Sequence, residues 1–501
     1  MPASEHFDVV IVGAGISGIG CAYYLQRQLP RKRYVILEGR ASTGGTWDLF
    51  RYPGVRSDSD VATFSYDFKP WDSDRVIASG PEILAYIRET AAENGIDERI
   101  RCNHRVRAAT WSRRRARWLL AVQRTDTGEY RQISCGWLFG ATGYYRYDQG
   151  YTPELPGLER FQGPVIHPQQ WPEELDYAGR RVVVIGSGAT AVTLIPAMAE
   201  TAAQVTMLQR SPSYIISLPS RDPLASWLRR RLGPHRAHRL ARLKNLAIQD
   251  AIYQFCQRRP QQASRLLRRL IAKQLPEGYP VDVDFNPSYG PWDQRLCAVP
   301  DGDLFKAMRD GKASVVTDTI ETFTPTGVRL ASGRELEADI VVTATGFSIL
   351  PFGGVQMIVD GRPVELHKTV AYRGVMLSGI PNFVFAIGYT TRSWTLKVGL
   401  VCDYFCRLLL YMDAHAHTAC VPELPSGSLD TRPLLEFQAG YILRALDRLP
   451  RQGNAAPWNL PMSHLVNDRQ LRRAPIDDPN LRFSGTGLAG PVPEPTVAAA
   501  V

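Results

Sequence analysis

Residues 9–18 read Val-Val-Ile-Val-Gly-Ala-Gly-Ile-Ser-Gly, an apolar run that passes directly into three glycines with the spacing G-x-G-x-x-G. Apolar residues at helical spacing follow, so the stretch predicts a strand, a tight turn and a helix. Glycine suits such a turn because the backbone must bend sharply and approach a pyrophosphate without a Cβ in between. The helix N-terminus then offers free N–H groups to the phosphate. The predicted ligand-binding residues are Gly13, Gly15 and Gly18.

A second turn of the same kind lies in residues 182–191, which read Val-Val-Val-Ile-Gly-Ser-Gly-Ala-Thr-Ala. Its glycines are Gly186 and Gly188, Thr190 follows them, and Ala191 replaces the third glycine. One such turn is weak evidence for a nucleotide site. Two copies, each between a strand and a helix, predict two Rossmann-like dinucleotide-binding domains and an α/β fold.

The residues that follow the two turns differ in charge. The strand after the first turn ends in Glu38, where an acidic residue bonds a ribose hydroxyl and repels a 2′-phosphate. The strand after the second turn, residues 204–208, leads instead to Arg210 and Ser211. A guanidinium binds phosphate and keeps its charge at any working pH. We therefore expect a dinucleotide without a 2′-phosphate at the first site and NADPH, rather than NADH, at the second.

The length and composition indicate an ordinary globular protein. A chain of 501 residues is too long for one core and predicts two or three domains. The eight cysteines show neither a C-x-x-C pair nor zinc-ligand spacing, so we expect reduced thiols and no metal site. The first predicted strand begins close to Met1, which leaves no room for a signal peptide, and no apolar run is long enough to span a bilayer. A cytoplasmic protein is expected.

The net charge of +10 is concentrated in one segment. Residues 221–275 contain fourteen Arg or Lys against Asp222 and Asp250, a local excess of +12, which leaves about −2 for the rest of the chain. Apolar residues at helical spacing and four prolines predict a basic helical insertion. Elements that would read or stack on bases are missing, so nucleic acid is not an expected partner. The two interpretations that remain are a solvated face near an anionic cofactor and weak association with a membrane surface.

Two longer motifs identify a family. The first is Gly45-x-Trp47-x-x-x-x-Tyr52-Pro53-Gly54-x-x-x-Asp58, and the second is Phe161-x-Gly163-x-x-x-His167-x-x-x-Trp171-Pro172. Both are complete fingerprints of the type I Baeyer-Villiger monooxygenases, within the class B flavoprotein monooxygenases, which this chain resembles along essentially its whole length. Stretches such as residues 50–54 and 291–297 are most similar to the ethionamide-activating subgroup.

This resemblance implies the cofactors FAD and NADPH and a reaction with O2. In such enzymes NADPH reduces the flavin, O2 forms a C4a-peroxyflavin, and this species converts a ketone to an ester or lactone, with sulfoxidation as a further activity. The implied domains are residues 1–146 for the first part of the FAD-binding domain and 147–379 for the NADPH-binding domain, with the insertion at about 221–290. Residues 380–490 complete the FAD-binding domain, and 491–501 form a tail rich in Pro and Ala that we expect to be disordered.

The resemblance also assigns roles to residues. Arg295 matches the catalytic arginine, which supplies a permanent positive charge near the oxidant, and Asp58 matches the acid that orients it. The first motif assigns flavin contacts to Gly45, Thr46, Trp47 and Asp58. Gln294 stands where many relatives carry a lysine, so either Arg210 and the basic insertion suffice for NADPH selectivity or that selectivity is weaker than in those relatives. Phe161, Gly163, His167 and Trp171 are expected to serve domain movement rather than chemistry, and Trp394 and Trp458 are weaker candidates for active-site aromatics.

Three rival functions differ in what they require. A disulfide reductase needs a redox-active cysteine pair beside its flavin, and the first domain has none at suitable spacing. An N- or S-oxygenating flavin enzyme of the same fold remains an alternative, because the same oxidant attacks amines and sulfur compounds. A non-catalytic flavin redox sensor is the alternative from another class, against which Arg295 and Asp58 argue together. The expected substrate is a hydrophobic ketone or sulfide, and no motif indicates its identity or the oligomeric state.

Overall fold

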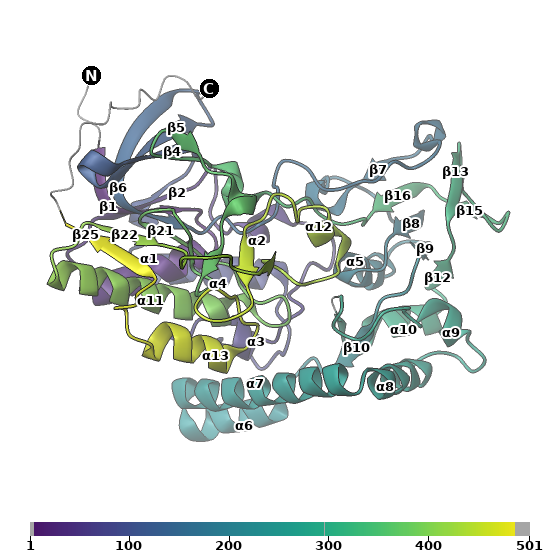
Figure 1. The fold of residues 1–501 in the computed structure, drawn as a ribbon. Coiled ribbons are helices and arrows are strands. Elements are labelled where there is room, and N and C mark those ends of the chain that lie inside the picture. Colours follow the sequence, from purple (N-terminus) through teal and green to yellow (C-terminus); the bar gives the residue numbers. More distant parts are fainter. Residues whose placement is uncertain (1–4, 295, 486–501) are drawn as a thin grey trace.

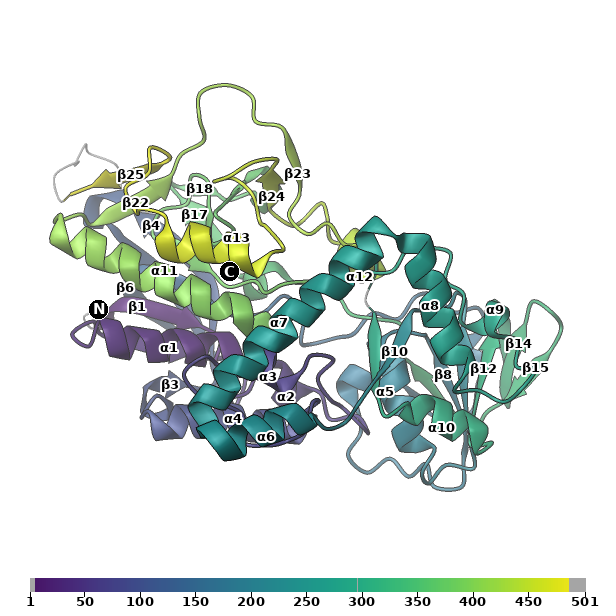
Figure 2. The ribbon, with the colours of Figure 1, turned by 90° about the horizontal axis from the view of Figure 1, so that it is seen from below.

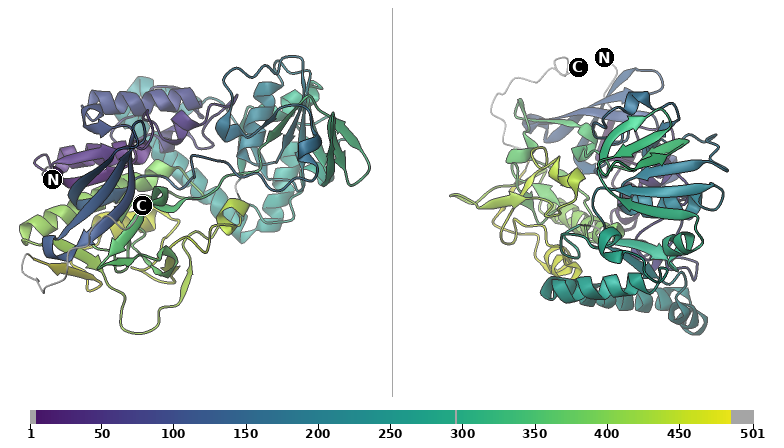
Figure 3. Two further views of the ribbon diagram at one scale, coloured as in Figure 1. Left: turned by 90° about the horizontal axis from the view of Figure 1, so that it is seen from above. Right: turned by 90° about the vertical axis from the view of Figure 1, so that its right-hand side faces the viewer.

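The computed structural model describes residues 5–294 and 296–485, which form two lobes side by side (Figures 1 and 3). The first lobe is built on a mixed sheet with the strand order β18-β17-β4-β5-β6-β1-β2-β3, in which β21 also pairs with β6. Strands β1, β2, β3 and β21 run parallel to their neighbours, and β4, β5 and β6 form an antiparallel meander. The bounds are β1 Glu5–Val12, β2 Tyr34–Leu37, β3 Ile100–Arg101, β4 His104–Ser112, β5 Arg117–Arg124, β6 Tyr130–Gly140, β17 Gln356–Val359, β18 Arg362–Pro363 and β21 Phe383–Phe385.

Strand β1 separates two hydrophobic cores in the first lobe. Its side chains alternate across the sheet, so Val9 and Ile11 pack into one core while Val10 and Val12 pack into the other. Helices α1 (Ile16–Gln28) and α11 (Trp394–Ala414) cover the first of these faces (Figure 1). Both faces are covered where β1 reads Val9 to Val12, and this part of the strand is apolar throughout, which is the pattern expected of a strand in a parallel sheet.

The second lobe contains a five-stranded parallel sheet in the order β12-β9-β8-β16-β7. Val182 and Val184 of β8 face α5 and α10, whereas Val183 and Ile185 face the small sheet β13-β14-β15. Two Rossmann-like sheets confirm the predicted α/β class. The bounds are β7 Val165–Ile166, β8 Arg181–Ile185, α5 Ala189–Met198, β9 Gln204–Gln209, α10 Asp303–Arg309, β12 Ala313–Thr317, β13 Ile320–Thr324, β14 Gly327–Leu330, β15 Glu335–Glu337 and β16 Ile340–Thr343.

The chain returns to the first lobe earlier than the predicted boundary at 379. Strand β16 still belongs to the second sheet, but Gln356–Ile358 of β17 already pair with Ala108–Thr110 of β4. A strand hydrogen-bonded into the first sheet must be counted with that sheet, so we place the crossing between residues 344 and 355. Sequence pattern did not reveal this, because β17 is short and its partner lies about 250 positions earlier in the chain.

The predicted basic insertion contains four helices. They are α6 Pro223–Leu232, α7 Pro234–Arg258, α8 Pro260–Ala272 and α9 Val281–Asp284. A proline occupies the first position of α6, α7 and α8, where its missing N–H has no intrahelical partner to lose. Figure 2 shows α7 crossing from one lobe to the other over the lower face of the molecule. None of the helices in the described part of the chain combines the length and apolarity that a bilayer crossing needs.

A buried carboxylate attaches the insertion to the first lobe. Asp60 caps α3 (Val61–Phe64) by accepting hydrogen bonds from the N–H and hydroxyl of Thr63, at 3.0 and 2.6 Å. It also accepts from Asn245 Nδ2 and Gln249 Nε2 of α7, both at 2.7 Å. Such a carboxylate is stable in the interior only because it has enough donors.

Replacing Asp60 by Ala should therefore loosen the insertion. We expect Asp60→Ala to lower the free energy of unfolding by about 3 kcal/mol, because buried amide donors lose their acceptor. Limited proteolysis should cut the Asp60→Ala protein faster within residues 221–290. The matched control is Asp222→Ala, which removes the cap of α6 and a salt bridge to Lys244 inside the insertion. Equal proteolysis rates for the two variants would contradict an attachment through Asp60.

Candidate active site

The glycines of the first turn are required by close backbone approach. Gly13 has φ +108°, and a Cβ there would lie 2.6 Å from the carbonyl oxygen of Ala141. A Cβ on Gly18 would collide with the carbonyl of Gly13. Gly15 caps α1, and a Cβ on it would point at the Cα of Gly45, 3.5 Å away. Gly15 and Gly45 therefore pack backbone against backbone. The glycine turn and the N-terminus of α1 form a cradle without Cβ atoms, as a pyrophosphate needs.

Glu38 lies beside this turn, as its place at the end of β2 predicts. Its Oε2 accepts the N–H of Ala14 at 2.9 Å and its Oε1 accepts the N–H of Arg40 at 3.0 Å. Burial raises the pKa of the Glu38 carboxyl, against the effect of these two bonds. The carboxylate is fixed at the edge of the glycine turn, where the ribose of a bound dinucleotide is expected.

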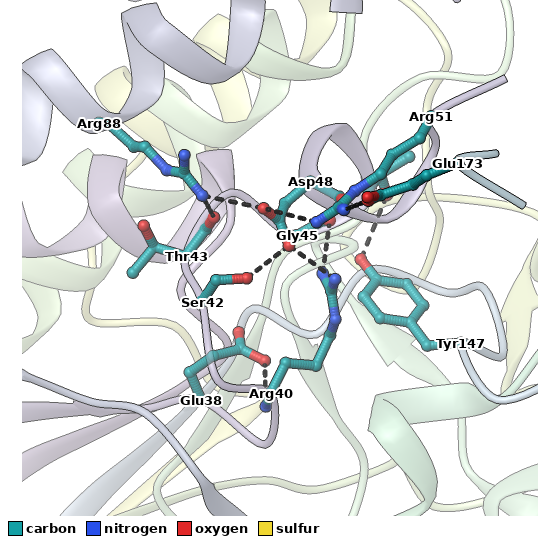
Figure 4. Close-up of polar contacts among 11 residues, drawn as sticks. Glu38, Arg40, Ser42, Thr43, Gly45, Asp48, Arg51, Arg88, Tyr147 and Glu173 are labelled. Atoms are coloured by element: carbon teal, nitrogen blue, oxygen red, sulfur yellow. Dashed lines mark hydrogen bonds and ion pairs between the residues drawn. The ribbon is translucent and has the colours of Figure 1, made fainter. Parts of the chain in front are cut away.

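Sequence reasoning missed Asp48, which organises the loop after β2. Figure 4 shows its carboxylate surrounded by basic and hydroxyl groups. It accepts from Arg40 Nη2 at 2.6 Å, Ser42 Oγ at 2.5 Å and Arg88 Nη2 at 2.8 Å. Asp48 is buried in the first turn of α2 (Thr46–Leu49) and fixes the start of that helix beside Gly45. Its position inside the first fingerprint was a usable signal, but its partner Arg88 lies 40 residues away.

The first fingerprint joins the two lobes. Tyr52 bonds Thr190 at the second glycine turn, and burial raises the pKa of Tyr52 to about 12. Gly54 has φ +75°, and a Cβ there would lie 2.7 Å from the carbonyl oxygen of Thr193 in α5. Earlier in the motif, Thr46 Oγ1 lies 3.2 Å from the hydroxyl of Tyr147. Trp47 packs edge-on against Phe64, with ring centroids 5.7 Å apart.

The second glycine turn has the same geometry as the first. Gly186 has φ +131° and faces the carbonyl of Ala344, which a Cβ would strike, whereas a Cβ on Gly188 would meet nothing within 4 Å. Gly188 caps α5, so the N-terminus of that helix faces open space. Arg210 and Ser211 follow β9 and are exposed. An exposed guanidinium beside an open helix N-terminus suits a phosphorylated ribose.

The second fingerprint lies in the connection between the lobes. Phe161 is buried edge-on against Phe323, and Gly163 leaves no room for a Cβ between Phe161 and the carbonyl of Asp339. Trp171 packs near Tyr177 at the edge of the core between the sheet of the second lobe and α5. Just after this fingerprint, Glu173 forms an ion pair with Arg51 of the first one, as Figure 4 shows.

His167 contacts both segments of the chain that connect the two lobes. Its Nε2 donates to the carbonyl of Gly346 at 3.0 Å, and its Nδ1 accepts the N–H of Gln169 at 3.2 Å. The ring also lies against Gly150, where a Cβ would overlap it. One side chain therefore contacts the outgoing connection at Gly150 and the returning one at Gly346. Burial lowers the pKa of His167, so the ring is neutral with its proton on Nε2.

A cavity of about 620 Å³ lies between the first lobe and the insertion. Asp58 lines it and accepts a hydrogen bond from Ser59 Oγ at 3.4 Å. Arg295 lies outside the described residues, but its neighbours Trp292 and Leu296 are both on the cavity wall. Most of the exposed surface of the wall is apolar and comes from residues such as Val61, Trp71, Ile216, Leu218, Ile248 and Ile252. Charged side chains, among them Arg229, Arg230 and Lys244, line the cavity as well.

Arg392 is the second residue that sequence reasoning missed. Its side chain is 3% exposed and forms an ion pair with Asp250 of α7. Among the described residues, no hydrogen-bond partner faces its Nε or Nη1, although Arg392 lines the cavity. Nearby, Trp394 donates to Ser17 Oγ at 2.8 Å, next to the first glycine turn, whereas Trp458 is buried in the core against Tyr372.

Comparison with known proteins gives concordant results. The sequence profile of the pyridine nucleotide-disulphide oxidoreductases matches residues 10–251. The FAD-containing monooxygenase EthA of Mycobacterium tuberculosis is 53% identical over 482 residues, 96% of this chain and 98% of that protein. The probable FAD-binding monooxygenase AlmA of Acinetobacter baylyi is 46% identical over 482 residues, 96% of each chain. Oxidized steroid monooxygenase bound to NADP has a similar fold, with a TM-score of 0.75 at 22% identity over 96% of this chain and 100% of that one.

The burial of His167 predicts a pH dependence of stability. Its pKa is lowered in the folded protein, so below the ordinary value of 6.5 the unfolded chain binds a proton that the folded one does not. The wild-type free energy of unfolding should fall as pH drops below 6.5, and His167→Gln should reduce that slope by at most about 1.4 kcal/mol per pH unit. Gln keeps an N–H donor for Gly346. His238 and His464, whose pKa values burial lowers to about 4, affect both proteins equally. Superimposable pH profiles would exclude a neutral, buried His167.

Proposed function

This chain belongs to the FAD-containing monooxygenases, and we propose that it acts as a Baeyer-Villiger enzyme that converts hydrophobic ketones to esters or lactones with O2 and NADPH. The observation that supports the proposal most directly is the set of contacts along the first fingerprint, residues 45–58. The fingerprint begins at the cradle beside Gly15, contacts the second glycine turn through Tyr52 and ends at Asp58 on the cavity wall. One continuous segment thus links both dinucleotide sites to a substrate-sized cavity.

The two glycine turns divide the cofactors between them. Gly13, Gly15, Gly18 and Glu38 suit FAD, because Glu38 binds a ribose hydroxyl and the cradle beside Gly15 accepts a pyrophosphate. Gly186, Gly188, Thr190, Arg210 and Ser211 suit NADPH. The flavin, once reduced by NADPH, supplies the activation of O2. We accordingly assign the first lobe to FAD and the second, with its basic insertion, to NADPH.

Arg295 and Asp58 are proposed as the catalytic pair. Addition of an anionic oxidant to a ketone puts negative charge on the carbonyl oxygen, and a fixed cation beside it stabilises that charge. A guanidinium also holds its protons too tightly to neutralise the oxidant. The position of Asp58 on the wall, with Trp292 and Leu296 of the Arg295 segment around the same cavity, supports this assignment.

The cavity wall indicates how a substrate is held. Its apolar lining suits the hydrocarbon part of a ketone. The guanidinium of Arg392 has two nitrogens, Nε and Nη1, to offer to a substrate oxygen, and Asp250 fixes its orientation. A sulfide fits the same apolar walls, so sulfoxidation is proposed as a secondary activity.

Product analysis tests the proposed reaction. The FAD-loaded protein should be supplied with NADPH and ¹⁸O2 together with matched aliphatic and aromatic ketones and thioethers. We expect esters that carry one ¹⁸O between the carbonyl and the α-carbon. Sulfoxides or N-oxides without any ester would favour the S- or N-oxygenating alternative. NADPH oxidation that yields only hydrogen peroxide with every substrate would refute the monooxygenase assignment to this cavity.

Substitution of Arg295 separates catalysis from cofactor binding. Arg295→Ala should retain FAD and continue to oxidise NADPH, while ester formation falls by about a hundredfold or more. Arg295→Lys, which keeps a charge, is the matched variant and should retain more activity than Ala. Ester formation by Arg295→Ala at the wild-type rate would remove Arg295 from the reaction.

Arg210 is expected to select the phosphorylated cofactor. Arg210→Ala should raise the KM for NADPH by about ten- to a hundredfold, since a charged hydrogen bond to the 2′-phosphate is lost. The KM for NADH should change little, because that cofactor has no phosphate there. Arg180→Ala, which alters another guanidinium at the base of the second sheet, serves as the charge control. Equal increases for both cofactors in Arg210→Ala would exclude a role in selection.

A further inference from the structure

The helices of the insertion expose an unusual number of apolar side chains. Ten of the eighteen exposed large apolar residues in the described chain lie on α6, α7 and α8, and the most exposed of the ten is Leu243, at 62%. They are Leu224, Trp227, Leu232, Leu240, Leu243, Ile248, Ile252, Phe255, Leu266 and Leu270. On α7, the spacing of Leu240, Leu243, Ala247, Ala251 and Phe255 places one stripe along the exposed side of the helix. A stripe of this length on a surface marks a contact with something else.

Basic side chains accompany the apolar ones on the same helices. Arg231, Arg236, Arg239, Arg258, Arg259, Arg265, Arg269 and Lys273 are all exposed. None of the ion pairs found between described residues uses any of these eight cations. Figures 1 and 2 show that α6, α7 and α8 form one layer along the lower side of the molecule. We call these eighteen exposed residues of the layer the basic face.

We propose that the basic face docks on an anionic lipid bilayer and lies in its interface. Interleaved Arg and large apolar residues match the two parts of such a surface, because guanidinium groups pair with lipid phosphates while Leu, Trp and Phe enter the acyl boundary. A helix that is amphipathic and basic lies in the plane of the membrane rather than across it. The contact therefore needs no spanning segment.

The charge and the apolar stripe of the basic face favour a lipid surface over two other partners, a second copy of the chain and nucleic acid. A second copy of the chain would bring two segments of +12 together, and their repulsion opposes a dimer through this face. Nucleic acid would satisfy the cations but would leave the stripe of Leu240, Leu243 and Phe255 without an apolar partner. Of these three partners, the anionic lipid surface is the one that uses both kinds of side chain at once.

The basic face also adjoins the cavity. Ile248 and Ile252 are exposed on α7 and line the cavity at the same time, so the stripe continues into its wall. If the proposed function holds, an apolar substrate dissolved in lipid would reach the cavity without crossing water. Membrane docking itself does not depend on that step and is measured without turnover.

Vesicle flotation tests the docking. The full-length FAD-loaded protein should bind vesicles that contain phosphatidylglycerol and should not bind phosphatidylcholine alone, and added salt should weaken the binding. Arg236→Gln/Arg239→Gln/Arg258→Gln should lower the partition coefficient about a hundredfold. Leu240→Ser/Leu243→Ser/Phe255→Ser should lower it at least about tenfold. The matched control, Arg113→Gln/Arg114→Gln/Arg115→Gln, removes three charges from the turn between β4 and β5 and should bind like the wild type.

Several results would overturn the proposal. They are an absence of binding to anionic vesicles at low salt, equal losses in the control and the α7 charge variant, and binding to duplex DNA that matches vesicle binding and ignores the Leu and Phe changes. A dimer that forms in place of vesicle binding and dissociates on the Leu and Phe changes would assign the face to a second copy. Retained FAD absorbance shows that each variant is folded. If a variant does not fold, the salt dependence of vesicle binding by the wild-type protein still tests the proposal.

Discussion

The arrangement of both lobes depends on the approach of Gly54 to the backbone of α5. A Cβ at this position would lie 2.7 Å from the carbonyl of Thr193, so the first fingerprint can rest on the second lobe only through a glycine. Tyr52 and its bond to Thr190 follow from that contact, because the tyrosine lies two residues earlier on the same loop. Asp58 lies four residues later and is brought to the cavity by the same loop. One close backbone contact thus sets the relation between the two glycine turns and the cavity.

Two buried carboxylates, Asp48 and Asp60, fix other elements of the structure in place. Asp48 and Asp60 are both carboxylates in the protein interior, and each accepts three or more hydrogen bonds. Some donors are local, but Arg88 lies 40 positions from Asp48, and α7 supplies the distant donors to Asp60. A buried carboxylate with missing donors would be costly, so each one fixes the elements that supply its partners. Asp48 fixes the loop that faces the first glycine turn, and Asp60 fixes α7 on the first lobe. We expect Asp48 and Asp60 to contribute more to a specific arrangement of these elements than to net stability.

The sequence predicted the features whose cause is local. Glycine turns, the acidic or basic residue after each one and a helical insertion interrupted by prolines are all decided within a few residues. Pairing between distant residues could not be predicted from the sequence. Strand β17 pairs with β4, and Asp48 binds Arg88, although a short stretch of sequence contains only one partner of each pair. The stripe of Leu240 and Leu243 shows another limit. Its spacing predicts a helix correctly, but the same periodicity describes a side chain that faces a core and one that faces a different partner.

The walls of the cavity come from both lobes and from the insertion, so a movement of one lobe would change the shape of the cavity. Its walls include Asp58 from the first lobe and α7, which is connected through the chain to the second lobe. Through Asn245 and Gln249, α7 is bonded to Asp60 of the first lobe, while His167 fastens the two chain crossings. If the second lobe rotates as it accepts and releases its dinucleotide, the segments on either side of α7 must absorb the motion, because the helix itself is held by a buried carboxylate. The cavity can then keep one wall fixed beside Asp58 while Ile216 and Leu218, which line it from the second lobe, move with that lobe.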